Sequence, residues 1–245
     1  MLGQRILVAG GSRGIGKAVA QALAVEDYQV TVIARNASQL TALQDKLSHA
    51  NHPINIVVLD LTDRKAVTDF FDQQNRPFDS MIVAAGIARH RPVYDILDQD
   101  IDDTLEVNIS VPIICTRAFA NLSIKHGAAG SIVLFSSQLA HVGAPERGLY
   151  CASKAAVDGF VRGAVADLSH YGIRINSVCP TFTETEMTRD ALSDDQFRKA
   201  VEAKIPLGRL GQPNDCVGIC KFLVSNESAM ITGTSIKVDG GWTAL

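Results

Sequence analysis

Residues 5–25, RILVAGGSRGIGKAVAQALAV, pass from a short apolar run through a glycine-rich turn into a stretch with the apolar spacing of a helix. The run Arg5–Ala9 reads as a buried strand and Lys17–Val25 as the helix. The glycines between them permit a tight turn and the approach of a pyrophosphate to the helix N-terminus, where free N–H groups favour anions. A glycine-rich turn can also simply join two elements, but its place at the first strand-to-helix junction favours a dinucleotide-binding α/β fold.

The same alternation of strand and helix continues along the chain. Near-continuous apolar runs are typical of strands that are covered on both faces, as in a parallel sheet. Strands are expected at Arg5–Ala9, Gln29–Ala34, Ile54–Leu59, Asp79–Ala84, Ser131–Ser136, Ile173–Val178 and Ser235–Val238. With no linker or repeat in view, we expect an α/β protein with one Rossmann-fold domain over residues 1–245. Its core would be a doubly wound, seven-stranded parallel sheet flanked by helices.

Two segments break this rhythm. Leu97–His126 is long enough for two consecutive helices. Thr181–Leu210 is a polar, charged insert between the end of a strand and the next helix. Because ligands of open α/β sheets bind beyond the carboxyl ends of the strands, we expect residues 181–210 to form a lid over the substrate.

Composition excludes several classes of function. A formal charge of −3 gives no basic excess for neutralising nucleic-acid phosphates, so neither DNA nor RNA is expected as a partner. No apolar run approaches the length of a membrane-spanning helix, and no membrane association is expected. The five cysteines form no CxxC pair and have no histidine cluster at metal-ligand spacing. We therefore expect buried thiols, no bound metal and a reducing, cytoplasmic location.

The second predicted strand ends in Arg35, where NAD-binding folds commonly place an acid that binds the adenosine ribose. A guanidinium there can pair with a 2′-phosphate, and Arg13 in the glycine loop can reach the same anion. The alternative is that Arg35 is an ordinary solvated loop residue. Asp60, after the third strand, suits a hydrogen bond to the adenine amino group, although helix capping around Thr62 and Asp63 explains an acid there nearly as well.

Tyr150 and Lys154 are four residues apart in a predicted helix, so their side chains share one face. An ammonium beside a phenol stabilises the phenolate and is expected to lower the tyrosine pKa from about 10 toward the working pH, as acid–base catalysis requires. This spacing is common by chance. It gains meaning from Ser137, which follows an apolar strand at the edge of the sheet where ligands bind.

In order and spacing, a set of short motifs resembles the short-chain dehydrogenase/reductase superfamily over nearly the whole chain. The motifs are AGGSRGIG (9–16), LDLTD (59–63), AAG (84–86), Asn108, FSS (135–137), YCASK (150–154), NSVCP (176–180), PLGRLGQP (206–213) and VDGG (238–241). The resemblance implies a nicotinamide-dependent oxidoreductase that moves a hydride between the cofactor and a carbonyl or alcohol carbon. The general pattern is closest to the 3-oxoacyl-carrier-protein reductase type, although Tyr171 stands where those enzymes often have a basic residue.

The resemblance also implies the roles of individual residues. Tyr150 would exchange a proton with the substrate oxygen, Ser137 would hold that oxygen, and Lys154 would bind the nicotinamide ribose. Asn108 would hold a helix backbone open for a proton-relaying water, although a generic capping residue would look the same. The expected catalytic tetrad is Asn108, Ser137, Tyr150 and Lys154. The expected cofactor-binding residues are Gly10, Ser12, Arg13, Gly14, Ile15, Gly16, Arg35, Asp60, Leu61, Ala85, Gly86, Tyr150, Lys154, Pro180, Thr181 and Thr185.

Three departures from the family pattern concern cofactor binding. Ala9 stands where the family usually has Thr, Val83-Ala84 replaces a pair of asparagines, and Thr181 replaces a glycine beside the nicotinamide carboxamide. Looser binding or compensation by other groups would follow. Thr185 and Met187 still match the T-x-M opening of the family's lid.

Several functions compete with NADP(H)-dependent catalysis. A non-catalytic NADPH-binding sensor needs only the glycine loop and Arg35, but the complete tetrad argues against it. A serine hydrolase would need a G-x-S-x-G nucleophile turn with a general-base histidine; the pentapeptide at residues 10–14 has that spacing but belongs to the glycine loop after the first strand, and Ser137 is better explained by Tyr150. An epimerase would normally carry a longer carboxyl-terminal domain.

The expected partner is a small carbonyl or alcohol substrate. Arg89 or Arg91 would attract an anionic substrate group, or else be an ordinary surface arginine, and Glu146 and Arg147 would add polar selectivity at the opposite rim. Family habit implies a homo-oligomer, tetramer or dimer, that pairs the helices containing Asn108 and Tyr150.

Overall fold

Within residues 3–26, 28–48 and 53–245, which the computed structural model describes, seven parallel strands form a single sheet. Their order is β3-β2-β1-β4-β5-β6-β7, as a doubly wound fold requires. The strands are β1 Arg5–Ala9, β2 Gln29–Ala34, β3 Asn55–Val58, β4 Ser80–Val83, β5 Gly130–Phe135, β6 Ile173–Pro180 and β7 Ser235–Val238. The predicted fold class and all seven strands are confirmed. β6 extends two residues beyond the prediction because Cys179 and Pro180 pair with Lys237 and Val238 of β7.

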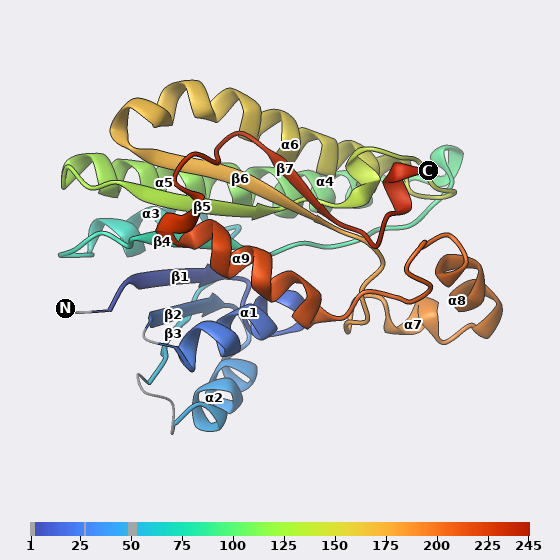
Figure 1. Ribbon diagram of the computed structural model, residues 1–245, viewed down its shortest axis with the longest axis horizontal. Coiled ribbons are helices and arrows are strands. Elements are labelled where there is room, and N and C mark those ends of the chain that lie inside the picture. The colour runs from blue at the N-terminus through green and yellow to red at the C-terminus, as the bar shows by residue number, and fades with distance from the viewer. Residues whose placement is uncertain (1–2, 27, 49–52) are drawn as a thin grey trace.

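Helices cover both faces of this sheet (Figure 1). Buried apolar side chains of α3, α5 and α6 pack on one face, and those of α1, α2 and α9 pack on the other. The helices are α1 Gly14–Ala24, α2 Ala37–Lys46, α3 Arg64–Asp72, α4 Asp98–Leu105, α5 Val111–Lys125, α6 Gly148–Leu168, α7 Arg189–Leu192, α8 Asp195–Glu202 and α9 Val217–Val224. Two apolar layers therefore hold the strands in register and fix where their carboxyl ends lie.

Leu97–His126 holds two consecutive helices, as expected, but no loop separates them. α4 and α5 are joined by a π-helical turn, Glu106–Ser110, so that residues 98–125 form one helical run. Val111 continues the helix without a break, and Pro112 is tolerated because it lies at the start of α5. This run is long and apolar enough to cross a membrane by length and composition, but 61% of its most apolar window is buried inside the protein, as in a core helix.

The order of the strands places a crevice at one edge of the sheet. The chain leaves β1 toward β2 and β3 and then returns to β4 on the other side of β1, so the loops after β1 and β4 diverge. α7 and α8 lie beyond the same carboxyl ends, at the right of Figure 1. The predicted lid and the glycine loop therefore border the same opening.

Candidate active site

A cavity of about 360 Å³ opens at the carboxyl ends of the central strands, within the size range of small-molecule sites. Its lining includes every residue that the sequence predicted for cofactor binding. These are Gly10, Ser12, Arg13, Gly14, Ile15, Gly16, Arg35, Asp60, Leu61, Ala85, Gly86, Tyr150, Lys154, Pro180, Thr181 and Thr185. Ser137 also lines the cavity, whereas Asn108 lies behind it.

The glycine loop is shaped by close backbone contacts that leave no room for side chains. Gly10 has φ +83°, and a β-carbon there would lie 2.5 Å from the backbone nitrogen of Ala85. A β-carbon at Gly16 would lie 2.4 Å from the carbonyl oxygen of Gly10. The loop therefore folds tightly back against the start of α1, as close approach to a pyrophosphate requires.

The first turn of α1 also differs from those of its neighbours. Asn36 caps α2 and Asp63 caps α3, each by accepting a hydrogen bond from a backbone N–H, but no side chain caps α1. The first N–H groups of α1 consequently face the cavity without an acceptor from their cap residue, Arg13. Unsatisfied helix N-termini bind phosphate groups well, so this end of the cavity fits the pyrophosphate of a dinucleotide.

Two arginines mark the far end of the cavity. Arg35 is exposed at the end of β2, Arg13 borders the glycine loop, and neither forms an ion pair with any carboxylate among the described residues. Asp60 is engaged locally, because its carboxylate accepts hydrogen bonds from the backbone N–H and the hydroxyl of Thr62 at 3.0 and 2.8 Å. The backbone bond from Thr62 holds the pKa of Asp60 below its ordinary value, with a smaller contribution from Arg35. The capping interpretation of the acids around Thr62 and Asp63 thus has direct support, and the contact of Asp60 with adenine stays a prediction.

Ser137, Tyr150 and Lys154 meet at the other end of the cavity. Ser137 follows β5, and its hydroxyl accepts a hydrogen bond from the N–H of Leu139 at 3.1 Å. The Lys154 ammonium donates to the carbonyl oxygen of Phe135 at 3.0 Å and lies 5.6 Å from the centroid of the Tyr150 ring. The Ser136 hydroxyl donates to the Lys154 carbonyl at 3.0 Å. The end of β5 is thereby tied to α6, which brings the three residues together as the sequence predicted.

Asn108 is fully buried at the centre of the π-helical turn. Its side-chain oxygen accepts from the N–H of Ile87 at 2.9 Å, and its amide nitrogen donates to the Ile87 carbonyl at 2.9 Å and to Ser153 at 3.1 Å. Asn108 therefore ties the loop after β4 to α6. A β-carbon at Gly86 would lie 3.5 Å from both Asn108 Oδ1 and Lys154 Nζ. The side chains of Asn108 and Lys154 therefore both approach the backbone at Gly86. Single π-turns are frequent at functional sites, which agrees with the proposed relay.

The pKa values of Tyr150 and Lys154 differ from those that the sequence led us to expect. Burial raises the pKa of Tyr150 to about 12, and interaction with the Ser137 hydroxyl offsets only part of that effect. Burial lowers the pKa of Lys154 to about 8, against the opposing influence of Cys179 and Asp158. The prediction that Lys154 lowers the phenol pKa therefore fails here, because desolvation outweighs an ammonium that is directed to the Phe135 carbonyl.

The residues that depart from the family pattern, Ala9, Val83-Ala84 and Thr181, all have defined surroundings in the structure. Ala9 and Val83 are buried, and Ala84 N donates to the Ala9 carbonyl at 2.8 Å. A β-carbon at Gly16 would lie 3.0 Å from that of Ala84, so the small side chain fits closely under the loop. The Thr181 hydroxyl is buried with no hydrogen-bond partner among the described residues and lines the cavity. An unpaired hydroxyl at this point can bind a polar group of a cofactor.

Comparison with known proteins decides the family. A family model described as "Enoyl-(Acyl carrier protein) reductase" matches residues 9–243. L-xylulose reductase of Caenorhabditis elegans is 35% identical over 98% of this chain and 96% of its own length. Gluconate 5-dehydrogenase of Gluconobacter oxydans is 33% identical over 98% of this chain and 95% of its own. The chain belongs to the short-chain dehydrogenase/reductase family.

Solved structures agree with this family. A candidate NAD(P)-dependent gluconate 5-dehydrogenase from Beutenbergia cavernae, with bound NADP at low occupancy, superimposes with a TM-score of 0.95. It is 28% identical and covers 100% of this chain and 98% of its own. As a member of the short-chain dehydrogenase/reductase family, the protein is an oxidoreductase that acts on alcohol or carbonyl groups of small molecules with a nicotinamide cofactor.

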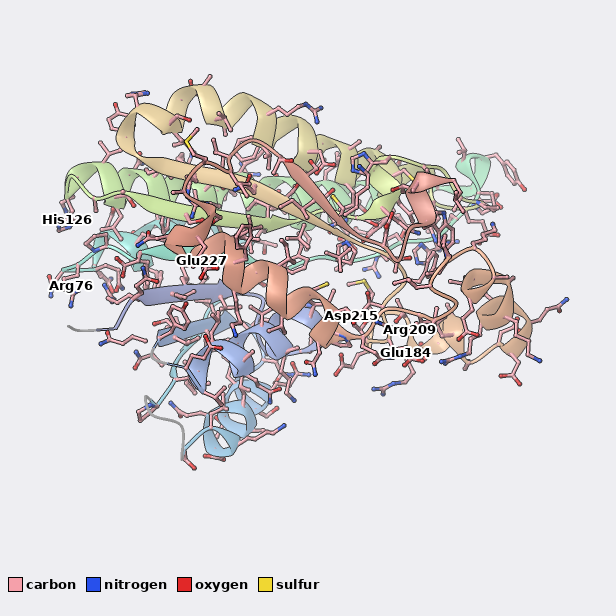
Figure 2. All side chains as sticks on the ribbon, in the orientation of Figure 1. Arg76, His126, Glu184, Arg209, Asp215 and Glu227 are labelled. Atoms are coloured by element: carbon pink, nitrogen blue, oxygen red, sulfur yellow. The ribbon has the colours of Figure 1, made fainter. Side chains whose placement is uncertain are left out.

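The predicted lid is anchored at its base in this dehydrogenase/reductase. Thr183 and Gly211 form an isolated parallel bridge that ties the two ends of the segment to each other. Arg209 pairs with Asp215 through two hydrogen bonds of 2.7 and 2.9 Å, and Glu184 pairs with Arg198. Figure 2 shows Glu184, Arg209 and Asp215 close to one another, between the end of α9 and the two lid helices. Between these anchors Thr185 and Met187 line the cavity, as the T-x-M motif implied.

The loop after β4 does not support the hypothesis that Arg89 or Arg91 attracts an anionic group of the substrate. Arg89 pairs with Asp103 at 2.9 Å, and Arg91 pairs with Asp100 at 2.6 Å, both on α4. Neither arginine lines the cavity. Their charges are already neutralised by neighbouring carboxylates, so the structure favours the interpretation of ordinary ion pairs over substrate binding.

Sequence reasoning missed a polar network behind Lys154. Asp158 is buried one turn further along α6, accepts a hydrogen bond from Ser177 at 2.7 Å and lies 3.3 Å from His141 Nε2. Cys179 Sγ lies 3.9 Å from Asp158 Oδ2, the carboxylate oxygen that His141 also contacts. His141, Asp158 and Cys179 are close enough for a metal ion, yet the Ser177 and His141 contacts already satisfy the carboxylate; absence of a metal stays a prediction. The i,i+4 spacing from Lys154 was the available signal for Asp158.

Proposed function

We propose that this protein is an NADP(H)-preferring reductase of small carbonyl compounds in which Tyr150 is the general acid. The observation that carries the proposal is the single cavity that joins the glycine loop and Arg35 to Ser137, Tyr150 and Lys154. The close backbone of the loop, the uncapped start of α1 and the unpaired Thr181 hydroxyl fit the pyrophosphate and carboxamide of a dinucleotide. When bound, the nicotinamide supplies the hydride.

The protein's own residues supply positioning and the proton. Ser137 donates a hydrogen bond to the substrate oxygen and so places the carbonyl carbon, while Tyr150 gives its proton to that oxygen as negative charge develops there. Lys154 holds the ribose hydroxyls, and Asn108 with the π-helical turn provides the route by which a proton returns through water. The lid, residues 181–210, excludes solvent over the substrate.

The raised pKa of Tyr150 keeps the phenol in the protonated form that carbonyl reduction uses. A phenol with a pKa of about 12 keeps its proton at neutral pH and can donate it to an alkoxide, whereas alcohol oxidation needs the scarce phenolate. This favours an enzyme over the non-catalytic sensor, because a sensor has no use for a buried proton donor beside Ser137.

The substrate we propose is a small polyhydroxylated carbonyl compound, such as a ketose or keto acid. The support is the nature of the relatives, L-xylulose reductase and gluconate 5-dehydrogenase, which match the chain from end to end. A 3-oxoacyl-carrier-protein substrate remains the second candidate, favoured by 33% identity over 98% of this chain with the 3-oxoacyl-[acyl-carrier-protein] reductase of Escherichia coli.

The experiment that tests this function follows NADPH absorbance with purified protein. The probes are L-xylulose, 5-keto-D-gluconate, the simple diketone butane-2,3-dione and an acetoacetyl thioester. We expect consumption of NADPH with the polyhydroxylated probes. Consumption with the thioester alone would move the assignment to the carrier-protein type, and no consumption with any probe would contradict the proposed function.

We also propose a cytoplasmic homo-oligomer, a dimer or tetramer. All five cysteines are free thiols, as a reducing compartment favours. Ile113 and Ile124 leave apolar surface exposed on α5, which suits pairing of this helix between subunits. Sedimentation equilibrium of the purified protein distinguishes these states from a monomer.

The lowered pKa of Lys154 predicts a pH-dependent cofactor affinity. Because its pKa falls from 10.5 to about 8, Lys154 is charged below pH 8 and loses its ammonium as pH rises above that value. NADPH affinity should be constant from pH 6.5 to 7.5 and weaken by up to about tenfold per pH unit above 8. The measurement is the dissociation constant for NADPH from fluorescence titration across this range.

The matched variant is Lys154→Met, which has no ammonium to lose. It should bind NADPH more weakly than wild type at pH 7, with an affinity that no longer changes between pH 7 and 9. A wild-type affinity that stays constant up to pH 9.5 would remove the proposed ribose role of Lys154.

A further inference from the structure

Arg147 is a buried cation beside the reacting groups. It is the residue that precedes the first turn of α6, three positions before Tyr150, and it is only 8% exposed. Its guanidinium forms no ion pair and no hydrogen bond with any of the residues 3–26, 28–48 and 53–245. Arg89 and Arg91, on the adjacent loop, are in contrast both paired with carboxylates of α4.

The charge of Arg147 acts on the groups around the substrate position. It lowers the pKa of Tyr150 slightly against the dominant effect of burial, and burial together with this charge lowers the pKa of His90 to about 4. The His90 ring lies 6.3 Å from the Tyr150 ring. His90 is therefore neutral at working pH, and the nearby Cys151 thiol, whose pKa is raised by burial, is neutral too. Burial lowers the pKa of Arg147 itself, and the neighbouring Glu146, Cys151 and Tyr150 offset only part of that effect.

The backbone holds Arg147 in this position at the expense of strain. Glu146 is the single non-glycine residue with positive φ, +60°, in the part of the chain that the structure describes. Its carbonyl accepts a hydrogen bond from the N–H of Arg91 at 3.2 Å, which ties the start of α6 to the loop after β4. Strained residues persist where the surrounding structure fixes them, and they are enriched at ligand-binding sites.

A buried guanidinium without a partner is unfavourable unless an anion completes it, and carboxylates are the groups that arginine binds best. We propose that Arg147 binds a carboxylate of the substrate, so that the enzyme prefers keto acids to neutral keto sugars. This rests on the proposed function, since the carboxylate must lie on a molecule whose carbonyl is held by Ser137 and Tyr150. Arg147, like Arg89 and Arg91, is not among the residues that line the cavity, but unlike them it has no carboxylate partner among the described residues, and it replaces them as the candidate anion-binding residue for that reason.

The test compares two probes that differ at one carbon. 5-Keto-D-gluconate carries a carboxylate where L-sorbose carries a hydroxymethyl group. Wild type should have a higher kcat/KM for the acid. Arg147→Gln should lower kcat/KM for the acid by about 10- to 100-fold, the scale of a lost charged hydrogen bond, and change that for L-sorbose less than about twofold. Arg147→Lys should restore part of the loss.

Arg91→Gln is the matched control, because it neutralises a neighbouring arginine that is already paired. It should leave the ratio of the two probes unchanged. Equal loss of activity toward both probes in Arg147→Gln would overturn the proposal and indicate a structural role, as would a preference for D-fructose 6-phosphate over both.

Inhibition supplies a second measurement that does not need turnover of either probe. With butane-2,3-dione as the substrate, D-gluconate should inhibit wild type competitively and D-sorbitol, its neutral counterpart, should not. Reduction of the diketone without inhibition by D-gluconate would overturn the carboxylate site and leave the proposed reductase function standing. Absence of diketone reduction together with inactivity toward every other probe would instead remove the proposed function itself.

Discussion

Replacement of Tyr150 by Phe should lower kcat by about 10²- to 10⁴-fold, the usual scale of general acid–base catalysis. The change removes one hydroxyl and keeps the ring, which packs in T-shaped contact with His90. Since the phenol holds its proton at neutral pH, its loss removes the donor to the substrate oxygen. Turnover is measured by NADPH absorbance, and cofactor affinity, by fluorescence titration, should be nearly unchanged.

Tyr171→Phe is the matched control for this substitution. Tyr171 is 45% exposed near the amino-terminal end of β6, far along the sheet from the cavity. It should retain the activity of wild type. Turnover of Tyr150→Phe within a few fold of wild type would exclude Tyr150 as the general acid.

Replacement of Arg35 by Asp should reverse the preference for NADPH over NADH. A guanidinium can form charge-assisted hydrogen bonds with a 2′-phosphate, whereas a carboxylate repels that phosphate and binds ribose hydroxyls instead. One charged hydrogen bond corresponds to about 10- to 150-fold discrimination between NADPH and NADH. Repulsion between the carboxylate introduced by Arg35→Asp and the 2′-phosphate should increase the change in this ratio further. The measurement is kcat/KM for both cofactors at fixed salt, because exposed charges are screened.

The control for this swing is Arg76→Asp, an equal charge change at an exposed arginine. Figure 2 shows Arg76 at the opposite end of the molecule from the lid. It should leave the cofactor ratio unchanged, and Arg35→Asp should keep its turnover with saturating NADH. A wild type that uses NADH as efficiently as NADPH would show that Arg35 is an ordinary loop residue.

Much of the architecture follows from local pattern. β-Branched runs such as Ile6–Ala9 and Val30–Ala34 are buried on both faces, so their near-continuous apolar character predicted a covered parallel sheet. Because parallel strands end at one edge, the order of the motifs along the chain was enough to place Ser137 and the glycine loop together. Helical spacing placed Tyr150 and Lys154 on one face of a helix, and Ser137 together with the family resemblance gave the pair its catalytic meaning.

Features that depend on distances between separate elements were not accessible in this way. The pairing of Arg89 and Arg91 with acids of α4 requires the loop after β4 to lie against that helix. The direction of the Tyr150 pKa depends on how far burial exceeds the effect of its neighbours. The unbroken run from α4 to α5 depends on a single π-turn that Asn108 fastens to Ile87.

The lid, residues 181–210, has an apolar cluster of its own. Leu192, Val201, Ile205 and Leu210 are buried together, with Phe182, Phe197 and Trp242 packed against them. The apolar packing of this cluster is thus made within the segment and with Trp242 near the carboxyl-terminal end, and one bridge, Thr183 to Gly211, ties the ends of the segment together. In evolutionary terms it is a replaceable module: its sequence can drift or be exchanged, and the range of accepted molecules can change with it, while the strands and the reacting groups beneath keep their geometry.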